Sequence, residues 1–264
     1  MFTEINKIWA TVLGMVSEKT ELEVLLLQND FSNLKLCIKS VVCAQNCDDL
    51  FVAPSVFDKN LFLNAIKTRD FDLLPDFMRG AASRAFETLL HTGDGQICDT
   101  IIDKCLLKKL VDIAKKSKIG LVKNYAEFFV AIANIKTAIR SCKTNKKIDF
   151  LNEALAECAT IDVNELKMAA MKSTEAIYAY LAGTPYGDAV LLLKKSMALF
   201  EKWCDDKIME MAKKEKSNNF TVAPILAYAL ARFNEVKAVR MIFLAKRNKI
   251  SNEILGERLR CMYV

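Results

Sequence analysis

Apolar residues recur along this chain at spacings of three and four, which is the period of one buried face of an α-helix. No segment shows the strict alternation of apolar and polar residues that is typical of a half-buried strand. The pattern predicts an all-α fold. The predicted helices cover residues 4–16, 21–28, 30–44, 97–116, 121–141, 187–216 and 222–247, with others after Asp58, from about Pro75 to the Gly93 turn, after Asp162, and from Ser251 through Cys261.

Capping residues mark several of the predicted helix starts. Asp58 and Ser251 have the side chains that accept hydrogen bonds from a first helical turn, and Asp162 with Glu165 has the spacing of a capping box. The clearest long helix is predicted at residues 187–216. Its apolar stripe is Leu193, Met197, Phe200, Cys204, Ile208 and Met211.

A six-residue phrase recurs at residues 30–35, 131–136 and 235–240, in steps of 101 and 104 residues. It reads as an apolar residue, a spacer, Asn or Ala, a second apolar residue and a cation. The two apolar positions lie three apart, so on a helix they share one face. Recurrence of this kind favours an internal repeat.

A second set of matches supports duplication over chance agreement between two Lys-rich amphipathic helices. The matches, offset by 98 residues, are Asp103-Lys104 with Glu201-Lys202, and Ala114-Lys115-Lys116 with Ala212-Lys213-Lys214. The third phrase begins 29 residues before Val264. Equal distances after the other phrases predict three helical units at residues 1–58, 59–161 and 162–264, the first of them shortened.

The composition is that of a folded helical protein. Hydrophobic residues make up 52% and charged residues 27% of the chain, and only 8 Gly and 4 Pro are present. The longest uncharged run, residues 217–231, is too short and too polar to span a membrane. We expect no secretory signal, because the start of the chain lacks a basic segment followed by an apolar one.

The positive charge is concentrated at the end of the chain. Residues 225–264 contain eight Lys or Arg against three acids, whereas the other 224 residues contain 30 cations and 29 anions. This asymmetry predicts an acidic partner surface, anionic headgroups or nucleic acid as the binding partner.

Signatures of enzyme chemistry are absent from the sequence. Gly93-Asp94-Gly95 lacks the further residues of a phosphate loop, and the only histidine, His91, is interpreted as a surface or capping residue. The nine cysteines include no CxxC pair, so we predict neither a zinc site nor a disulfide framework, but core thiols in a reducing cytosol. Cys43 and Cys47 are interpreted as packing residues. Solvated charges explain Asp48-Asp49, Asp205-Asp206 and the lysines of 104–123 and 143–147 better than catalysis or nucleic-acid binding.

The chain resembles the C subunit of the V-type and archaeal-type rotary ATPases, which is related to the d subunit of the eukaryotic V-ATPase. The residues that carry the resemblance are the phrases at 30–35 and 133–136, Ala227-Tyr228, Asn234-Glu235-Val236, Val239-Arg240, Ile254, Glu257-Arg258-Leu259-Arg260 and Tyr263-Val264. Ala131, Ala238, Gly256 and Cys261 depart from the family pattern.

The resemblance implies three similar helical units in a pseudo-threefold funnel, the first incomplete. It implies a non-catalytic subunit without cofactor or metal, peripheral to the membrane on its cytoplasmic side. Such a subunit is a socket between the central shaft subunits and the membrane proteolipid ring during H⁺ or Na⁺ transport. The basic C-terminal unit, through Arg240, Arg258 and Arg260, is then the expected contact with acidic shaft residues or ring loops.

Two other interpretations stay open on the sequence alone. One is a soluble helical-repeat adaptor or scaffold unrelated to a rotary ATPase. The other is an enzyme, which requires a concave site containing His91 or clustered carboxylates. The acidic phrase residues Asp30 and Glu235 are interpreted as packing residues that satisfy Lys35, Arg240 or nearby helix ends.

Overall fold

The computed structural model describes residues 2–16, 19–218 and 220–263, and within these ranges the chain forms helices and no strand. The predicted all-α fold is confirmed. The α-helices of the described ranges are α1 (Phe2–Met15), α2 (Glu23–Val42), α3 (Lys59–Thr68), α4 (Asp76–Thr92), α5 (Gly95–Lys116), α6 (Gly120–Lys143), α7 (Ile148–Ala154), α8 (Val163–Lys172), α9 (Thr174–Ala182), α10 (Val190–Lys195), α11 (Met197–Lys214), α12 (Ala223–Arg247) and α13 (Asn252–Arg258).

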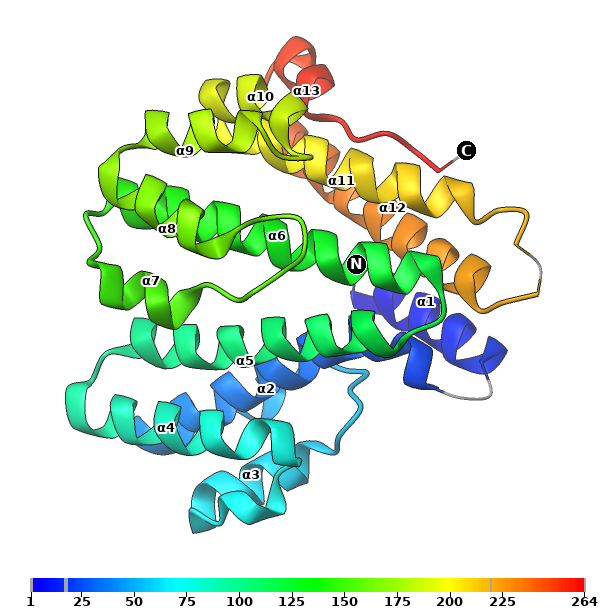
Figure 1. Cartoon of the computed structure of the whole chain (residues 1–264). Coiled ribbons are helices and arrows are strands. Elements are labelled where there is room, and N and C mark those ends of the chain that lie inside the picture. Colours follow the sequence, from blue (N-terminus) through cyan, green and yellow to red (C-terminus); the bar gives the residue numbers. More distant parts are fainter. Residues whose placement is uncertain (1, 17–18, 219, 264) are drawn as a thin grey trace.

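Long helices form the frame of the molecule (Figure 1). Helices α5 and α6 pack on each other as one hairpin, and α11 and α12 as another, whereas α1 and α2 are paired only as consecutive helices of the chain. Between these pairs, α2 packs on α5, α6 packs on α11, and α12 packs on α1. The contacts therefore link the three pairs in a cycle, in which the step from α1 to α2 is made by the chain itself. The division into three units and the funnel stay predictions.

The shorter helices cover the outside of this frame. Helices α3 and α4 pack against α2, and α4 also packs against α5. Helices α7, α8 and α9 pack against α6. These contacts bury large apolar side chains such as Phe31, Phe86 and Phe200.

Residues predicted as two helices, 21–28 and 30–44, form the single helix α2. Asn29 and Asp30, where the two predicted helices meet, lie within α2, and their side chains bind a neighbouring loop. The Asn29 amide donates to the Pro54 carbonyl oxygen at 2.8 Å. The Asp30 carboxylate accepts from the backbone amides of Val56 and Phe57, each at 2.9 Å.

The predicted long helix 187–216 is wrong, because the chain breaks at Ser196. This residue is extended (φ −165°, ψ 151°), and it ends α10 and caps α11. Its hydroxyl accepts a hydrogen bond from the Leu199 amide at 3.1 Å, which is the competition with helix geometry that serine side chains offer. The last helix, α13, ends at Arg258 rather than at Cys261.

Three predicted caps are present. Asp58, Asp162 and Ser251 each accept a hydrogen bond from the first turn of the helix that follows. The Asp162 amide, however, donates to the Tyr180 hydroxyl at 2.7 Å, so a tyrosine takes the place that a capping box gives to Glu165. In the part of the chain described, none of the helices has the length and apolar character to cross a membrane.

Candidate functional site

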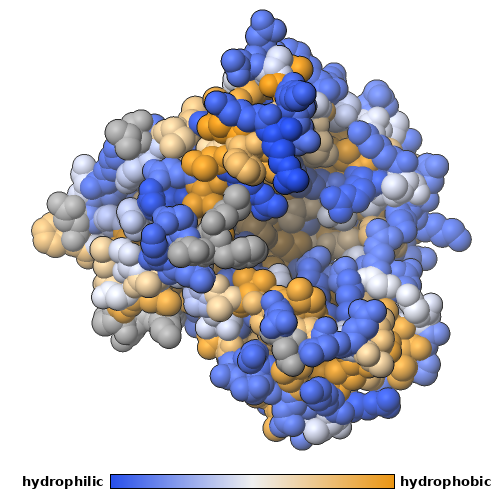
Figure 2. All heavy atoms as spheres, turned by 180° about the vertical axis from the view of Figure 1, so that it is seen from behind, coloured by the Kyte–Doolittle hydropathy of each residue, from blue (hydrophilic) through white to orange (hydrophobic). Residues whose placement is uncertain are grey.

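A cavity of about 310 Å³ lies where α1, α2, α6, α11 and α12 meet. Its walls are mainly apolar. The helical side chains that line it are Ile5, Trp9, Leu25, Gln28, Asn29, Tyr125, Asp205, Ile208, Met209, Leu230, Phe233, Asn234 and Lys237. The face of the molecule opposite to the view of Figure 1 is hollowed near its middle and exposes apolar atoms there (Figure 2).

Aromatic side chains join separate helices around this cavity. The Trp9 and Phe233 rings, from α1 and α12, have centroids 5.2 Å apart. Gln28 of α2 donates to the Tyr125 hydroxyl of α6 at 3.3 Å. Burial raises the pKa of Tyr125 above its usual value. The phenol therefore stays neutral, and the cavity can bind apolar side chains and neutral polar groups of a partner.

Charged groups enter the cavity at one edge, around Asp205. Its two carboxylate oxygens accept from Lys237 Nζ at 2.9 Å and from Arg260 Nε at 2.7 Å. Asp206 accepts from the Cys261 amide at 2.6 Å. The prediction that this acidic pair is merely solvated is wrong, because the pair ties the C-terminal tail to α11. The other acidic pair predicted to be solvated is Asp48-Asp49, and the side chain of Asp48 is not among those that the structure describes.

Helices α2, α6 and α12 contain the three recurring phrases and are called the phrase helices. Each contains an asparagine that binds a later segment of the chain where it returns to that helix. Asn33 exchanges two hydrogen bonds with the backbone of Val52, at 2.9 and 2.8 Å. Asn134 does the same with Ala156, at 2.7 and 3.0 Å. Asn234 donates to the Cys261 carbonyl oxygen at 2.9 Å, and its own amide oxygen is buried without a hydrogen-bond partner in the described residues.

These hydrogen bonds change the alignment of the third phrase with the first two. Alignment of residues 235–240 with the other phrases places Ala238 opposite Asn33 and Asn134. The hydrogen bonds give that position to Asn234 instead, four residues earlier on α12. The shift is one helical turn, so the apolar spacing of three and four fits both registers and could not separate them.

The 98-residue offset has a structural counterpart in ion pairs between helix pairs. The phrase cation Lys35 binds Asp103 of α5 at 2.6 Å, and the phrase cation Lys136 binds Glu201 of α11 at 3.0 Å. Asp103 and Glu201 are the acids matched by that offset. Each acid thus holds the phrase helix of the preceding pair.

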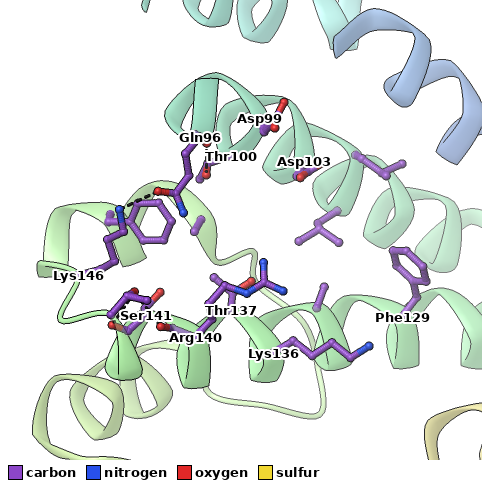
Figure 3. A pocket seen from close by; sticks show the side chains of 16 residues that line it. Gln96, Asp99, Thr100, Asp103, Phe129, Lys136, Thr137, Arg140, Ser141 and Lys146 are labelled. Carbon is purple, nitrogen blue, oxygen red and sulfur yellow. Dashed lines mark hydrogen bonds between the residues drawn. The ribbon is translucent and has the colours of Figure 1, made fainter. Parts of the chain in front are cut away.

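A polar cleft of about 440 Å³ lies beside these ion pairs, between α5, α6 and α7 (Figure 3). Lys146 donates to Gln96 Oε1 at 2.7 Å across one end of it. Arg140 extends from α6 into the cleft, opposite Asp99 and Asp103 of α5 (Figure 3). Charges of both signs on α5 and α6 allow polar contacts between the two helices across this cleft.

The three arginines predicted as a partner contact line one cleft of about 370 Å³ beside α12 and α13. Arg240 and Arg258 are exposed, and neither forms an ion pair within the described residues. Arg260 differs, because its side chain is only 16% exposed and binds Asp205. Apolar side chains, among them Leu244 and Leu255, also line the cleft, and the lining residues described include no acid.

The remaining candidates have structural surroundings. His91 is exposed and lies 3.1 Å from the carboxylate of Glu87, one turn away on α4. Cys43 is exposed and Cys47 buried. Burial raises the pKa of the Cys204 thiol to about 12. No group of three or more metal-ligating side chains gathers within the described ranges.

The acidic phrase residues bind other groups than the phrase cations. Asp30 binds the amides just before α3, as a packing residue at a helix end does. Burial raises its pKa, although those two hydrogen bonds oppose the shift. Glu235 pairs with Arg232 rather than with Arg240.

Comparison with known proteins gives one consistent result. The family model described as ATP synthase (C/AC39) subunit matches residues 2–258. The C subunit of the V-type sodium ATPase of Enterococcus hirae is 24% identical over 246 residues, which cover 88% of this chain and 72% of that protein.

Proposed function

The chain belongs to the family of the ATP synthase (C/AC39) subunit, and from this premise we propose that it is a non-catalytic central-stalk subunit of a V-type or archaeal-type rotary ATPase. It forms a socket that receives the rotating shaft and couples it to the membrane proteolipid ring during H⁺ or Na⁺ transport. In this role it is peripheral to the membrane, on the cytoplasmic side, through its contacts within the complex.

The observation that carries this proposal is that each of the three pairs of long helices contacts both of the others, with the apolar cavity among them. Helices α2, α6 and α12 each pack on the first helix of another pair, and the cavity lies among them. Because each pair packs on both of the others, displacing one pair disturbs the packing with both. The arrangement therefore suits a rigid body that transmits torque and carries out no chemistry.

The apolar cavity is proposed to hold the tip of a shaft helix. Its walls offer Trp9, Leu230 and Phe233 for contact, with the Asp205 group at the edge. Apolar contact between the tip and these walls supplies affinity, while the uncharged phenol of Tyr125 offers one oriented polar contact.

The exposed arginines of the α12–α13 cleft are proposed to meet acidic residues of the shaft or the ring loops. The test is pull-down of purified shaft subunits by the wild-type chain and by R240E/R258E. We expect weaker capture that is sensitive to salt. The matched control is K123E, because Lys123 is also exposed but lies on α6. Unchanged capture by R240E/R258E would remove these arginines from the interface.

Arg260 requires a separate variant. Because its guanidinium holds the tail through Asp205, R260E is expected to loosen residues 259–263 as well as to alter charge. Proteolytic sensitivity of the tail, measured beside capture, separates the two effects.

A further inference from the structure

When α2, α6 and α12 are aligned at Asn33, Asn134 and Asn234, the outer faces of the three helices differ in burial. We compare four positions that lie on one side of each helix, at the same distances from the asparagine. They are Leu27, Phe31, Leu34 and Ile38 on α2; Phe128, Ile132, Ile135 and Ile139 on α6; and Tyr228, Arg232, Glu235 and Val239 on α12. All eight positions on α2 and α6 are buried, whereas none of the four on α12 is.

The difference follows from what packs against each helix. Helices α3 and α4 pack on α2, and α8 and α9 pack on α6. Helix α12 packs mainly on α1, α6 and α11, which leaves its outer face toward solvent. The comparison indicates that an amphipathic helix is the kind of element that this side of a phrase helix accepts.

Along α12 the outer face changes character. In its first half, Arg232 and Glu235 form an ion pair that suits contact with water. Farther along, Val239 and Phe243 are 64% and 62% exposed. They are four residues apart, so they form one apolar surface. Two large apolar side chains exposed together beside a polar stretch are typical of a contact site.

Exposed cations follow this apolar pair toward the end of α12 and just beyond it. Lys246, Arg247 and Lys249 are exposed, and none of them forms an ion pair within the described residues. Arg247 lies four residues after Phe243 and therefore borders the pair on the same side of the helix. A complementary surface must then carry apolar residues one turn apart and carboxylates at their flank.

We propose that Val239, Phe243, Lys246 and Arg247, which we call the distal α12 surface, bind an acidic amphipathic helix of a partner protein. The partner helix places its apolar face on Val239 and Phe243, and its Asp or Glu residues reach Arg247 and Lys246. Val239 corresponds to Ile38 on α2 and Ile139 on α6, which are both buried, and the partner helix extends this cover one turn further, over Phe243. A helix fits better than a lipid surface, since helices cover the corresponding faces elsewhere in this chain.

The deciding experiment measures binding of a designed peptide to the full chain by fluorescence anisotropy. The peptide is a helix of about 18 residues, with Leu at spacings of three and four and Glu beside the Leu stripe. We expect binding that weakens with salt. V239S/F243S should weaken it by roughly tenfold or more, because the main apolar contact is lost, and R247E should weaken it to a lesser degree.

The matched control is L191S, which removes another exposed apolar side chain, 71% exposed, from α10. Circular dichroism checks that each variant is folded. A second peptide with Lys in place of Glu should bind far more weakly.

Four results would overturn the proposal: no binding of the Glu peptide, equal binding of both peptides, equal losses in L191S and V239S/F243S, or binding of phosphatidylserine vesicles with neither peptide bound. Sedimentation of the free chain gives a further outcome, since a dimer abolished by V239S/F243S would assign the surface to self-association. No other ATPase subunit enters the experiment, so its result is independent of the proposed socket role.

Discussion

Replacing each of the three asparagines with alanine should destabilise the protein by different amounts, in the order Asn134, Asn33, Asn234. All three lie at corresponding places on α6, α2 and α12, and all three side chains bind returning backbone. What differs is the burial of the backbone groups that each substitution leaves without a partner.

The magnitudes follow from that burial. Asn134→Ala strips both hydrogen bonds from the backbone of Ala156, which is 1% exposed, so neither group can turn to water. An unsatisfied buried group costs about 1–3 kcal/mol, and two such groups give about 2–6 kcal/mol. Val52 is 44% exposed, so water can replace Asn33, and the loss should be about 1 kcal/mol.

The third substitution should cost least. Asn234 makes one hydrogen bond, to the carbonyl of the exposed Cys261, and its amide oxygen is buried without a partner. Asn234→Ala loses the bond but also removes the unsatisfied oxygen. We expect a loss of about 0–1 kcal/mol.

Urea unfolding followed by circular dichroism and by tryptophan fluorescence measures these differences, and coincident transitions justify a two-state treatment. The order of the three variants is the result of interest, because all three remove the same atoms. Equal losses at all sites, or the largest loss at Asn234, would refute the argument from burial.

Three further predictions concern single groups. Burial raises the pKa of Asp30, so the folded state holds the Asp30 proton more tightly than the unfolded state does. The contribution of Asp30 to stability is therefore full below the ordinary pKa of 3.8 and is lost as the pH rises through the folded pKa. When unfolding is measured from pH 7 down to pH 4, wild type should gain stability relative to Asp30→Asn, and parallel curves would contradict this. Cys43 should react with maleimide at pH 8 well before Cys204, whose pKa is about 12; mass spectrometry of the labelled peptides decides, and equal rates would show that Cys204 is accessible. Asp205→Ala should release the C-terminal tail and speed proteolysis within residues 259–263 several-fold with little loss of helix, whereas an unchanged digestion rate would deny Asp205 the anchoring role.

Local physics made most of the helices predictable. Apolar spacing, together with caps such as Asp58 and Asp162, depends on residues within a few positions of each other, and those signals are visible in sequence. The break at Ser196 was missed because the apolar stripe continues in phase across it. Lys194 and Lys195 followed by a serine were a usable signal, since basic residues end helices and serine begins them.

Contacts between distant residues were harder to predict. Asp205 and Asp206 reach backbone and side chains more than fifty positions later, and nothing local in sequence separates such anchors from solvated acids. The correct alignment of the third phrase was nevertheless visible in the sequence. Asn33, Asn134 and Asn234 recur in steps of 101 and 100, which is more regular than the steps of 101 and 104 between the phrases.

That Arg240 and Arg258 contact a partner stays a prediction. The charge excess of the last forty residues pointed to Arg240 and Arg258, and both are exposed on one cleft. Composition could not reveal that Arg260 is held by Asp205, because that pairing depends on how the tail returns over α11. The apolar exposure of Val239 and Phe243 likewise becomes visible only once the covering helices are known.

The most direct test of the central account is photo-cross-linking in the assembled ATPase from the wall of the central cavity. A benzoylphenylalanine is placed at Ile5, which lines the cavity on α1, and in a control at Leu191 on the exposed side of α10. The socket role predicts that the probe at Ile5 cross-links to a shaft subunit and that the probe at Leu191 does not. Cross-links to the shaft from Leu191 but not from Ile5 would place the shaft outside the cavity and contradict the account.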